Sequence, residues 1–425
     1  MVMTTGLRFL MAAKRCEMAD LEQLARTSQL VDTTARMIHA LQRERGLSNL
    51  YLGSDGKAAA DDRQAQVQAS VAHETALRHC LDGLNTDPTG MVNGARLFSR
   101  IAYVLHGLEA LPELRRRVEL RAWSARRTTE AYSRLVAALL AVVFEAADTA
   151  SDPDISRLLV GLFNFMQGKE CVGQERATGS AMFASGQAGN VEQQRLLHLI
   201  ESQERCLEVF GDFADTDLLA LWEEHRSLAP MADLERLRRI LCTTLPGQPL
   251  PTEHSRVWFQ GCSTRIDHMR TVEEKLCGQL QQLCAHKLAQ AQRELDNLEQ
   301  LKTTLATGAT GQDPDMSFFD GASDPTVAPA EHVLGSHLNR AVLELLHAQE
   351  GRLQKVSEEL DTVRASLNER KVIERAKGLL MAHRQLSEED AHRTIRQMAM
   401  NQGRRLIDVA EALLAMAEVL PARLR

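Results

Sequence analysis

Two arginines stand on helix faces that should otherwise be buried, and this limits the folds open to the chain. In QRERGLSNLYLGSDG, residues 42–56, and in the preceding turn, apolar or small side chains recur at steps of three and four. This is the period of one helix face, and Arg45 lies on that face. Arg176 lies on a similar apolar face within residues 158–186. Because a buried arginine does not lose its proton, each of these two charges needs an anionic partner.

The segments around the two arginines resemble each other and indicate a degenerate internal repeat. ERGLSNLYLGSDG and ERATGSAMFASGQ each contain Glu-Arg, small residues with a serine, an aromatic residue and a Gly/Ser helix stop. Two equivalent helices packed about a pseudo-twofold axis would bring Arg45 and Arg176 together. Either acids such as Glu44 and Glu175 cancel the two charges as structural salt bridges, or a bound anion does. Guanidinium groups match planar oxyanions in bidentate fashion. The small neighbouring residues leave room for a small anion only: Gly46, Ser48, Ala177 and Gly179.

The rest of the chain favours an all-α fold. Aromatic residues make up only 4%, while Leu, Ala, Arg, Glu and Gln dominate, and turn signals separate long helical segments. One such signal is Asp152 or Ser151 before Pro153, the pattern of an N-cap followed by a first-turn proline. We predict a long-helix bundle sensor domain, a linker, a coiled-coil segment and a small C-terminal three-helix bundle. Their predicted ranges are 1–305, 306–331, 332–367 and 368–425.

The coiled-coil segment is predicted from leucines that repeat every seven residues with a companion row offset from them. The two rows are Leu346, Leu353, Leu360 and Leu367, and Val342, Gln349, Val356 and Val363. This seam fits either a helix that lies on a neighbouring domain or a parallel dimeric coiled coil. We favour the coiled coil, and hence a homodimer, because the seam follows a Gly/Asp/Pro-rich linker.

Several classes of protein find no support in the sequence. No apolar run reaches the roughly 18 residues of a membrane span, and the N-terminal segment has no signal-peptide cleavage pattern. The eight cysteines are scattered without zinc-ligand spacing, and we find no Gly-rich phosphate loop and no Ser/His/Asp or Cys/His set. We therefore expect a cytoplasmic protein that is not an enzyme and has no metal, no cofactor and no membrane partner.

RERGLSNLYLGSDG together with GQERATGSAMFASG resembles the NIT domain, the all-helical nitrate- and nitrite-sensing family, over about residues 30–300. The segments DLERLRRIL at 233–241 and VWFQGCSTRIDHMRTVEEKL at 257–276 fit this family as well. In the family two motif arginines clamp the ligand, which implies that Arg45 and Arg176 bind nitrate or nitrite here. We add Ser48 to this site. Arg236 is a weaker candidate, since it could equally be a solvated residue of a basic helix face.

The C-terminal module differs in charge from the body. The chain carries a net charge of -7, yet residues 368–425 contain 11 Lys/Arg against 8 Asp/Glu. A basic module on an acidic body suggests a polyanionic partner for that module. A three-helix bundle with merely solvated charges remains the alternative. No clear helix-turn-helix is present, so RNA is favoured over duplex DNA.

The motifs of this module look like the ANTAR domain, whose members bind RNA and antiterminate transcription. They are RKVIERAKGLLM, SEEDA, IRQMAM and DVAE. The resemblance implies two adjacent RNA hairpins with small loops as the target. From the faces that point away from the predicted core, the expected RNA contacts are Arg370, Lys377, Gly378, Arg393, Arg396, Gln397, Asn401 and Arg404.

A NIT-like body with an ANTAR-like tail implies a nitrate- or nitrite-responsive transcription antiterminator. In this hypothesis an anion bound between the Arg45 and Arg176 helices releases the tail, which binds leader-mRNA hairpins and prevents termination. The competing hypothesis is an anion sensor that signals by protein–protein contact through its C-terminal helices.

Overall fold

All the regular elements of the described residues are helices, apart from one isolated β-bridge between Gln187 and Pro249. The structure is a computed structural model of the chain. It describes residues 2–84, 94–227, 229–245, 248–307, 334–386 and 388–419. The predicted all-α class is confirmed. The predicted linker 306–331 lies almost entirely outside the described residues.

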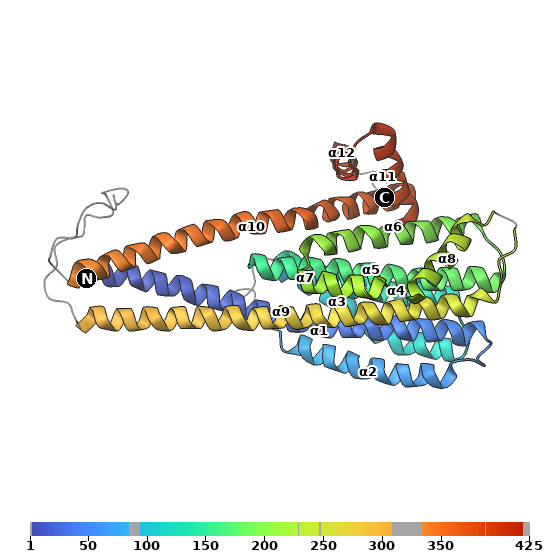
Figure 1. Cartoon of the computed structure of the whole chain (residues 1–425), viewed down its shortest axis with the longest axis horizontal. Helices are drawn as coiled ribbons and strands as arrows, with labels where there is room; N and C mark the ends of the chain where they lie inside the picture. The colour runs from blue at the N-terminus through green and yellow to red at the C-terminus, as the bar shows by residue number, and fades with distance from the viewer. Residues whose placement is uncertain are drawn as a thin grey trace.

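Twelve helices account for most of the described residues, and the three longest extend beyond the others into a stalk (Figure 1). The body helices are α1 (Val2–Gly53), α2 (Ala60–Asp82), α3 (Gly94–Glu119), α4 (Ala125–Thr149), α5 (Pro153–Ser185), α6 (Asn190–Phe213), α7 (Thr216–Arg226), α8 (Ala229–Thr243) and α9 (His254–Thr307). The remaining helices are α10 (Leu334–Arg384), α11 (Glu388–Gln402) and α12 (Leu406–Val419).

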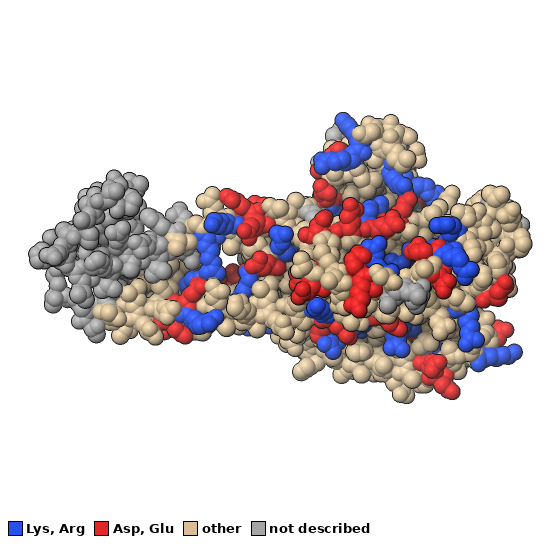
Figure 2. Space-filling model, viewed as in Figure 1, with Lys and Arg blue, Asp and Glu red and all other residues tan. Residues whose placement is uncertain are grey.

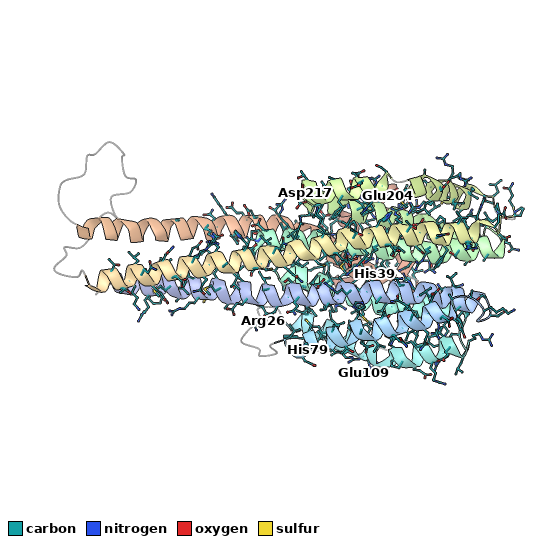
Figure 3. The ribbon with its side chains drawn as sticks, turned by 60° about the horizontal axis from the view of Figure 1, so that its bottom comes forward. Arg26, His39, His79, Glu109, Glu204 and Asp217 are labelled. Atoms are coloured by element: carbon teal, nitrogen blue, oxygen red, sulfur yellow. The ribbon has the colours of Figure 1, made fainter. Side chains whose placement is uncertain are left out.

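The body contains two helix bundles of similar plan. In the first, α1 packs on α2 and α4, and α3 packs on α4; in the second, α5 packs on α6 and α9, and α8 packs on α9. The bundles join where α1 lies along α9 and α4 lies along α5. Figure 3 shows α1 and α9 side by side along the stalk as well. Among the described residues no helix combines the length and the apolar character needed to cross a membrane.

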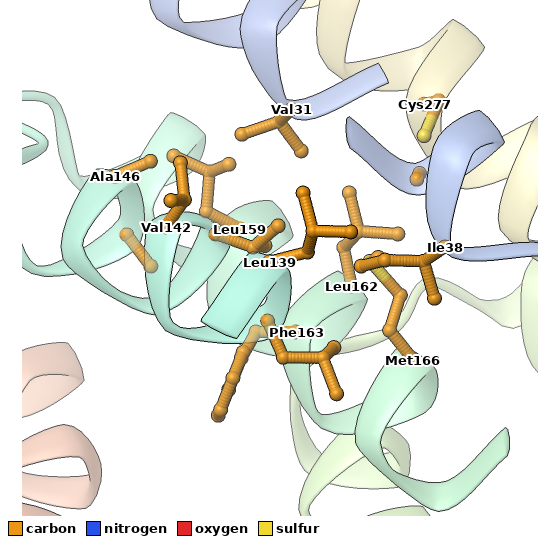
Figure 4. Packing of buried hydrophobic residues seen from close by; sticks show 14 of the residues in the cluster. Val31, Ile38, Leu139, Val142, Ala146, Leu159, Leu162, Phe163, Met166 and Cys277 are labelled. Atoms are coloured by element: carbon orange, nitrogen blue, oxygen red, sulfur yellow. The ribbon is translucent and has the colours of Figure 1, made fainter. Parts of the chain in front are cut away.

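The hydrophobic core lies where the two bundles meet. Side chains from α1, α4 and α5 interdigitate there, including Val31, Ile38, Leu139 and Leu162 (Figure 4). Because α5 packs against α1, α4, α6 and α9, almost every face of this helix is buried. A helix in this position can carry polar groups only if they find partners inside the body.

The caps that the sequence predicts around α5 are present. The Asp152 side chain accepts hydrogen bonds from the backbone N–H groups of Asp154 and Ile155, both at 3.1 Å, and Pro153 opens the helix. At its other end Gly186 adopts φ 67°, a left-handed conformation that glycine takes without steric cost. Of the two predicted N-caps, Asp152 is therefore the one used.

The predicted coiled-coil segment and the first helix of the C-terminal module form one continuous helix, α10. Val363 and Leu367 join the main hydrophobic core, and Leu360 is also buried. Leu353, one heptad earlier, is 57% exposed. The C-terminal end of the seam therefore packs on the sensor body of the same chain, as the first alternative proposed, while Leu353 faces solvent.

The C-terminal three-helix bundle has a small core of its own. The end of α10 packs with α11 and α12 through Ala376, Leu380, Ala391, Ile395 and Val409. Figure 1 places this bundle against the body beside α6. The predicted boundary at 367–368 falls inside α10, so a rigid helix connects the bundle to the segment that packs on the body.

Candidate anion-binding site and the C-terminal interface

Arg45 has a buried counter-charge, and it comes from the other repeat. Its side chain on α1 is 1% exposed. Nη1 donates to Glu170 Oε1 at 2.5 Å and to Ser133 Oγ at 2.7 Å, and Nη2 donates to Glu170 Oε2 at 3.1 Å. Glu170 also accepts hydrogen bonds from the side-chain amides of Gln42 and Gln174, each at 2.9 Å. This carboxylate on α5 is thus held by a guanidinium fork and two amides.

Arg176 is buried as well, but no carboxylate of the described residues pairs with it. Nη1 donates to Ser263 Oγ at 2.9 Å, and Nη2 donates to the backbone oxygen of Gln42 at 3.1 Å. Its guanidinium carbon lies 4.8 Å from the centre of the Phe259 ring. Within the described ranges Arg176 forms no ion pair. Burial and the charge of Arg45 lower the pKa of Arg176 to about 10, so its side chain stays protonated at neutral pH.

Two glycines let the two arginines approach the opposite helix. A Cβ added at Gly46 would lie 2.4 Å from Nη2 of Arg176, and one added at Gly173 would lie 2.4 Å from Nη2 of Arg45. Both distances are shorter than real Cβ contacts. The arrangement is reciprocal: each arginine passes over a glycine of the other repeat. The structure thus brings Arg45 and Arg176 together.

The glutamates that precede the two arginines bind other partners. Glu44 accepts from Arg115 Nε at 2.8 Å and Nη2 at 3.0 Å. Glu175 accepts from Arg238 Nε at 2.6 Å and Nη2 at 2.7 Å. Glu44 and Glu175 therefore do not neutralise Arg45 and Arg176, because they pair with arginines of α3 and α8. The wider alternative, a structural salt bridge with another acid, holds for Arg45, whose partner is Glu170.

These contacts support the internal repeat. In each repeat the glutamate accepts hydrogen bonds from Nε and Nη2 of a buried arginine on another helix. The arginine that follows this glutamate in sequence donates to a serine of a neighbouring helix. The repeats differ in one respect, since in the part of the chain that the structure describes only Arg45 pairs with a carboxylate. Two guanidiniums and one carboxylate leave one unit of positive charge buried in the site.

The other predicted ligand residues lie as follows. Ser48 is fully buried on α1, about one turn after Arg45. The Arg236 side chain is 64% exposed on α8, 3.7 Å from Asp233, and the structure does not place it with the two arginines. Arg238 is the inward residue of this helix, because it shares a face with the buried residues Leu234, Leu237 and Leu241.

Glu170, Gln42 and Arg238 belong to the site or its support, and sequence reasoning missed all three. The helical period marks Arg238, which lies at the steps of three and four from the leucines of its helix. No such signal marks Glu170, because α5 is buried on nearly every side and its apolar stripe has no polar opposite face.

Replacing Gly173 by alanine tests the close approach of Arg45. The new methyl group would displace the guanidinium and loosen its pair with Glu170, so we expect a loss of roughly 1–3 kcal/mol in the free energy of unfolding. Gly168, on the same helix, is a matched control, since a Cβ there would meet ordinary contacts at 3.5 Å or more. Gly168→Ala should be neutral or stabilise by up to about 1 kcal/mol. Equal effects of the two changes in urea unfolding would contradict this account.

On the outer side of α6 the C-terminal bundle docks on the sensor body (Figure 1). Arg396 of α11 forms an ion pair with Glu201 of α6, and the rings of His392 and His198 lie 4.9 Å apart. Burial, followed by the charge of Arg205 and other basic groups nearby, lowers the pKa of His392 to about 3. His392 is therefore neutral at physiological pH.

The comparisons with known proteins agree with this architecture. A sequence profile described as "Nitrate and nitrite sensing" (NIT) matches residues 36–281, and the ANTAR domain profile matches residues 361–414. The nitrate regulatory protein of Klebsiella oxytoca is 32% identical over 405 residues, which are 95% of this chain and 93% of that protein. The chain belongs to the NIT family of nitrate and nitrite sensors and carries an ANTAR domain.

The solved structure of the NasR transcription antiterminator matches with a TM-score of 0.61 and 30% identity, covering 97% of this chain and 99% of that one. Both similar proteins are regulators by name, in agreement with the prediction that this chain is not an enzyme.

The residues predicted to bind RNA fall into two groups in this NIT–ANTAR protein. One group is exposed on the ANTAR domain: Gly378, Arg393, Gln397, Asn401 and Arg404. The other group faces the NIT domain or is covered. Arg370 lies 4.7 Å above the Phe163 ring of α5, and Arg396 pairs with Glu201. Lys377 lies outside the apolar core of the bundle, but it is buried and pairs with Glu374 at 2.8 Å, so the exposure expected of it is wrong. Figure 2 shows basic groups on the ANTAR domain above a body of mixed charge.

Proposed function

We propose that this protein is a nitrate- or nitrite-responsive transcription antiterminator. An anion binds between Arg45 and Arg176 and shifts the ANTAR domain from the docked state to a state that binds leader-mRNA hairpins and blocks termination. The observation that carries this proposal is the buried guanidinium of Arg176, which lies beside Arg45 and has no carboxylate partner within the described residues.

The chemistry of the site suits a small planar oxyanion. The guanidinium of Arg176 presents N–H donors in a plane, and the serine hydroxyl and glycines around it leave little room for a bulky ligand. An anion there would offset the repulsion between the two arginines. Such compensation is worth several kcal/mol for a buried charge.

The anion site and the docking surface share helices. The α5 helix carries Glu170 and Arg176, and it also carries Phe163, on which Arg370 lies. The α6 helix packs along α5 and carries Glu201 and His198, which contact the ANTAR domain. A small displacement of α5 on anion binding would therefore reach the docked surface directly.

Further contacts hold α10 on the body near this point. Arg364 Nη2 donates to the backbone oxygen of Ala150 at 2.9 Å, and Lys371 forms an ion pair with Asp148. Because Arg370 and Arg396 contact the NIT domain, the docked state withholds part of the predicted RNA-binding surface. The anion must bind the released state more tightly than the docked state, since equal affinity for both would shift nothing.

We further propose RNA rather than DNA as the partner, and a homodimer as the active assembly. The exposed arginines and amides of the ANTAR domain can neutralise phosphates and hydrogen-bond unpaired bases, and guanidinium planes can stack on those bases. An RNA-binding role of this kind would place the protein in the cytoplasm.

The test is a titration of leader RNA with the full-length protein, with and without nitrate or nitrite, combined with a transcription readthrough assay. We expect tighter hairpin binding and more readthrough with the anion. Equal affinity and equal readthrough in both conditions would refute anion-gated antitermination. Anion-dependent exposure of the ANTAR domain without RNA binding would instead favour signalling by protein contact.

Replacing Glu201 by glutamine should weaken docking and raise RNA affinity in the absence of the anion. The Glu201–Arg396 pair is partly exposed, so its loss should change the docking equilibrium by roughly 0.2–1 kcal/mol, or up to a few fold. Glu204→Gln is the matched control on α6. Glu204 is exposed, and within the described residues it forms no ion pair. An equal gain in anion-free RNA binding for both variants would show that the net charge of the body, rather than this contact, sets the docking.

A further inference from the structure

We propose that Glu170 sets the charge of the anion that this site accepts, so that monovalent anions bind and divalent anions are rejected. The inference rests on the proposed function, because it concerns the same site. Glu170 would determine specificity without binding the anion directly.

The carboxylate is firmly held inside the site. Glu170 is 2% exposed, and four N–H groups donate to it: two from Arg45 and one each from Gln42 and Gln174. Displacing it would leave a buried charge without a partner, which is strongly unfavourable. Glu170 therefore stays on Arg45 when an anion arrives, and the arriving anion meets the remaining charge of Arg176.

The neighbouring charged clusters each balance their own charge. Glu44 and Glu74 face Arg115 and Arg78. In the second repeat, Glu175 and Glu235 face Arg238 and Arg265. In a third cluster, Glu273 and Glu274 face Lys169 and Arg270. None of these clusters has a charge to spare. The carboxylate of Asp267 also acts on Arg176, but it is exposed to solvent and forms no ion pair with it in the described residues. The excess of one positive charge in the buried interior therefore belongs to Arg45, Arg176 and Glu170.

This excess determines which anions fit. A monovalent oxyanion such as nitrate or nitrite brings the buried site to neutrality. A divalent anion such as sulfate would leave one uncompensated negative charge in the interior, which is strongly unfavourable. Without Glu170 the site would carry two positive charges, and a divalent anion would then be the neutral match.

The Glu170→Gln change should be tolerated by the fold. The glutamine has nearly the same volume, and its carbonyl oxygen can still accept from Arg45. Its amide can donate to Oε1 of Gln42, a buried oxygen that has no hydrogen-bond partner in the described structure. Circular dichroism and thermal unfolding would verify folding of the variant before binding is measured.

Calorimetry on the full-length protein, with nitrate and sulfate at matched ionic strength, tests the proposal. Wild type should bind nitrate and not sulfate. In Glu170→Gln the affinity for sulfate relative to nitrate should rise by roughly tenfold or more, which corresponds to about 1.4 kcal/mol. The control Glu74→Gln removes a carboxylate from a cluster away from the two arginines and should leave the ratio unchanged. An unchanged ratio in folded Glu170→Gln would overturn the proposal.

A second measurement uses the wild type alone and does not depend on any variant. Perchlorate and sulfate are both tetrahedral, but they carry one and two negative charges. If charge governs selection, perchlorate should compete with bound nitrate and sulfate should not. Failure of both to compete would show that shape governs selection and would overturn the role of Glu170. Absence of nitrate binding to wild type would instead refute the proposed function itself.

Discussion

Replacing Arg176 by methionine should abolish nitrate binding and, at the same time, raise the free energy of unfolding of the anion-free protein. The second effect runs against the usual expectation that removing a buried side chain destabilises a protein. It follows because Arg176 is 5% exposed, forms no ion pair in the described residues, and lies beside a second guanidinium whose charge helps lower its pKa to about 10. Methionine fills a similar volume without the desolvation cost. Replacing even a paired set of buried ions by apolar residues is often neutral or stabilising by about 1–4 kcal/mol, and for this unpaired ion we expect a gain within that range.

Urea unfolding with and without nitrate measures both parts of this prediction. Nitrate should raise the unfolding midpoint of wild type, because a ligand that binds the native state stabilises it, and should leave that of Arg176→Met unchanged. Arg236→Met is the control, since this side chain is 64% exposed on α8. It should change the stability by no more than about 0.5 kcal/mol and preserve the nitrate response. The same nitrate-induced shift in Arg176→Met as in wild type would show that the anion binds elsewhere.

The corresponding change in the first repeat, Arg45→Met, should have the opposite effect on stability. It leaves the Glu170 carboxylate buried with two amides and, within the described residues, without an ion-pair partner. Arg176 donates instead to Gln42 and Ser263. Removing one partner of a buried ion pair costs about 3–5 kcal/mol, and we expect a loss of that size.

A double-mutant cycle identifies the cause of this loss. Arg45→Met combined with Glu170→Met removes both charges of the pair, so the double variant should be more stable than Arg45→Met alone by several kcal/mol. The free energies of unfolding of the four proteins give the coupling energy. Additive effects of the two changes would mean that the ion pair between Arg45 and Glu170 contributes nothing specific to the fold.

The sequence predicted a large part of this site and of the fold around it. Arg45 and Arg176 are recognisable because each interrupts an apolar stripe at helical spacing, and the shared Glu-Arg motif indicated that they belong together. The N-cap at Asp152 and the helix end before Gly186 follow from local backbone chemistry, which acts over a few residues and can be read from them. The predicted break between α5 and α6 was right for the same reason.

Other features could not be predicted, because they depend on which helices meet. The local pattern places Lys377 on a solvent-facing side of its helix. In the folded chain the side chain is buried, which its own segment does not show. Arg370 and Arg396 likewise find partners on α5 and α6, far away in the sequence. Whether a charged face is solvated depends on the surface opposite it, and a single segment carries no information about that surface.

By itself, the sequence determined that this protein is helical, that it repeats one charged motif, and that two arginines must point inward. These properties arise from side-chain period and local capping, which neighbouring residues set. Only the tertiary structure decided which arginine keeps an unpaired charge. Glu44 and Glu175 are adjacent to the arginines in sequence, yet they bind Arg115 and Arg238, while Glu170 crosses from the other repeat to Arg45. Electrostatic energy depends on distance in space and on burial. The packing of the two bundles therefore determines which carboxylate pairs with which arginine.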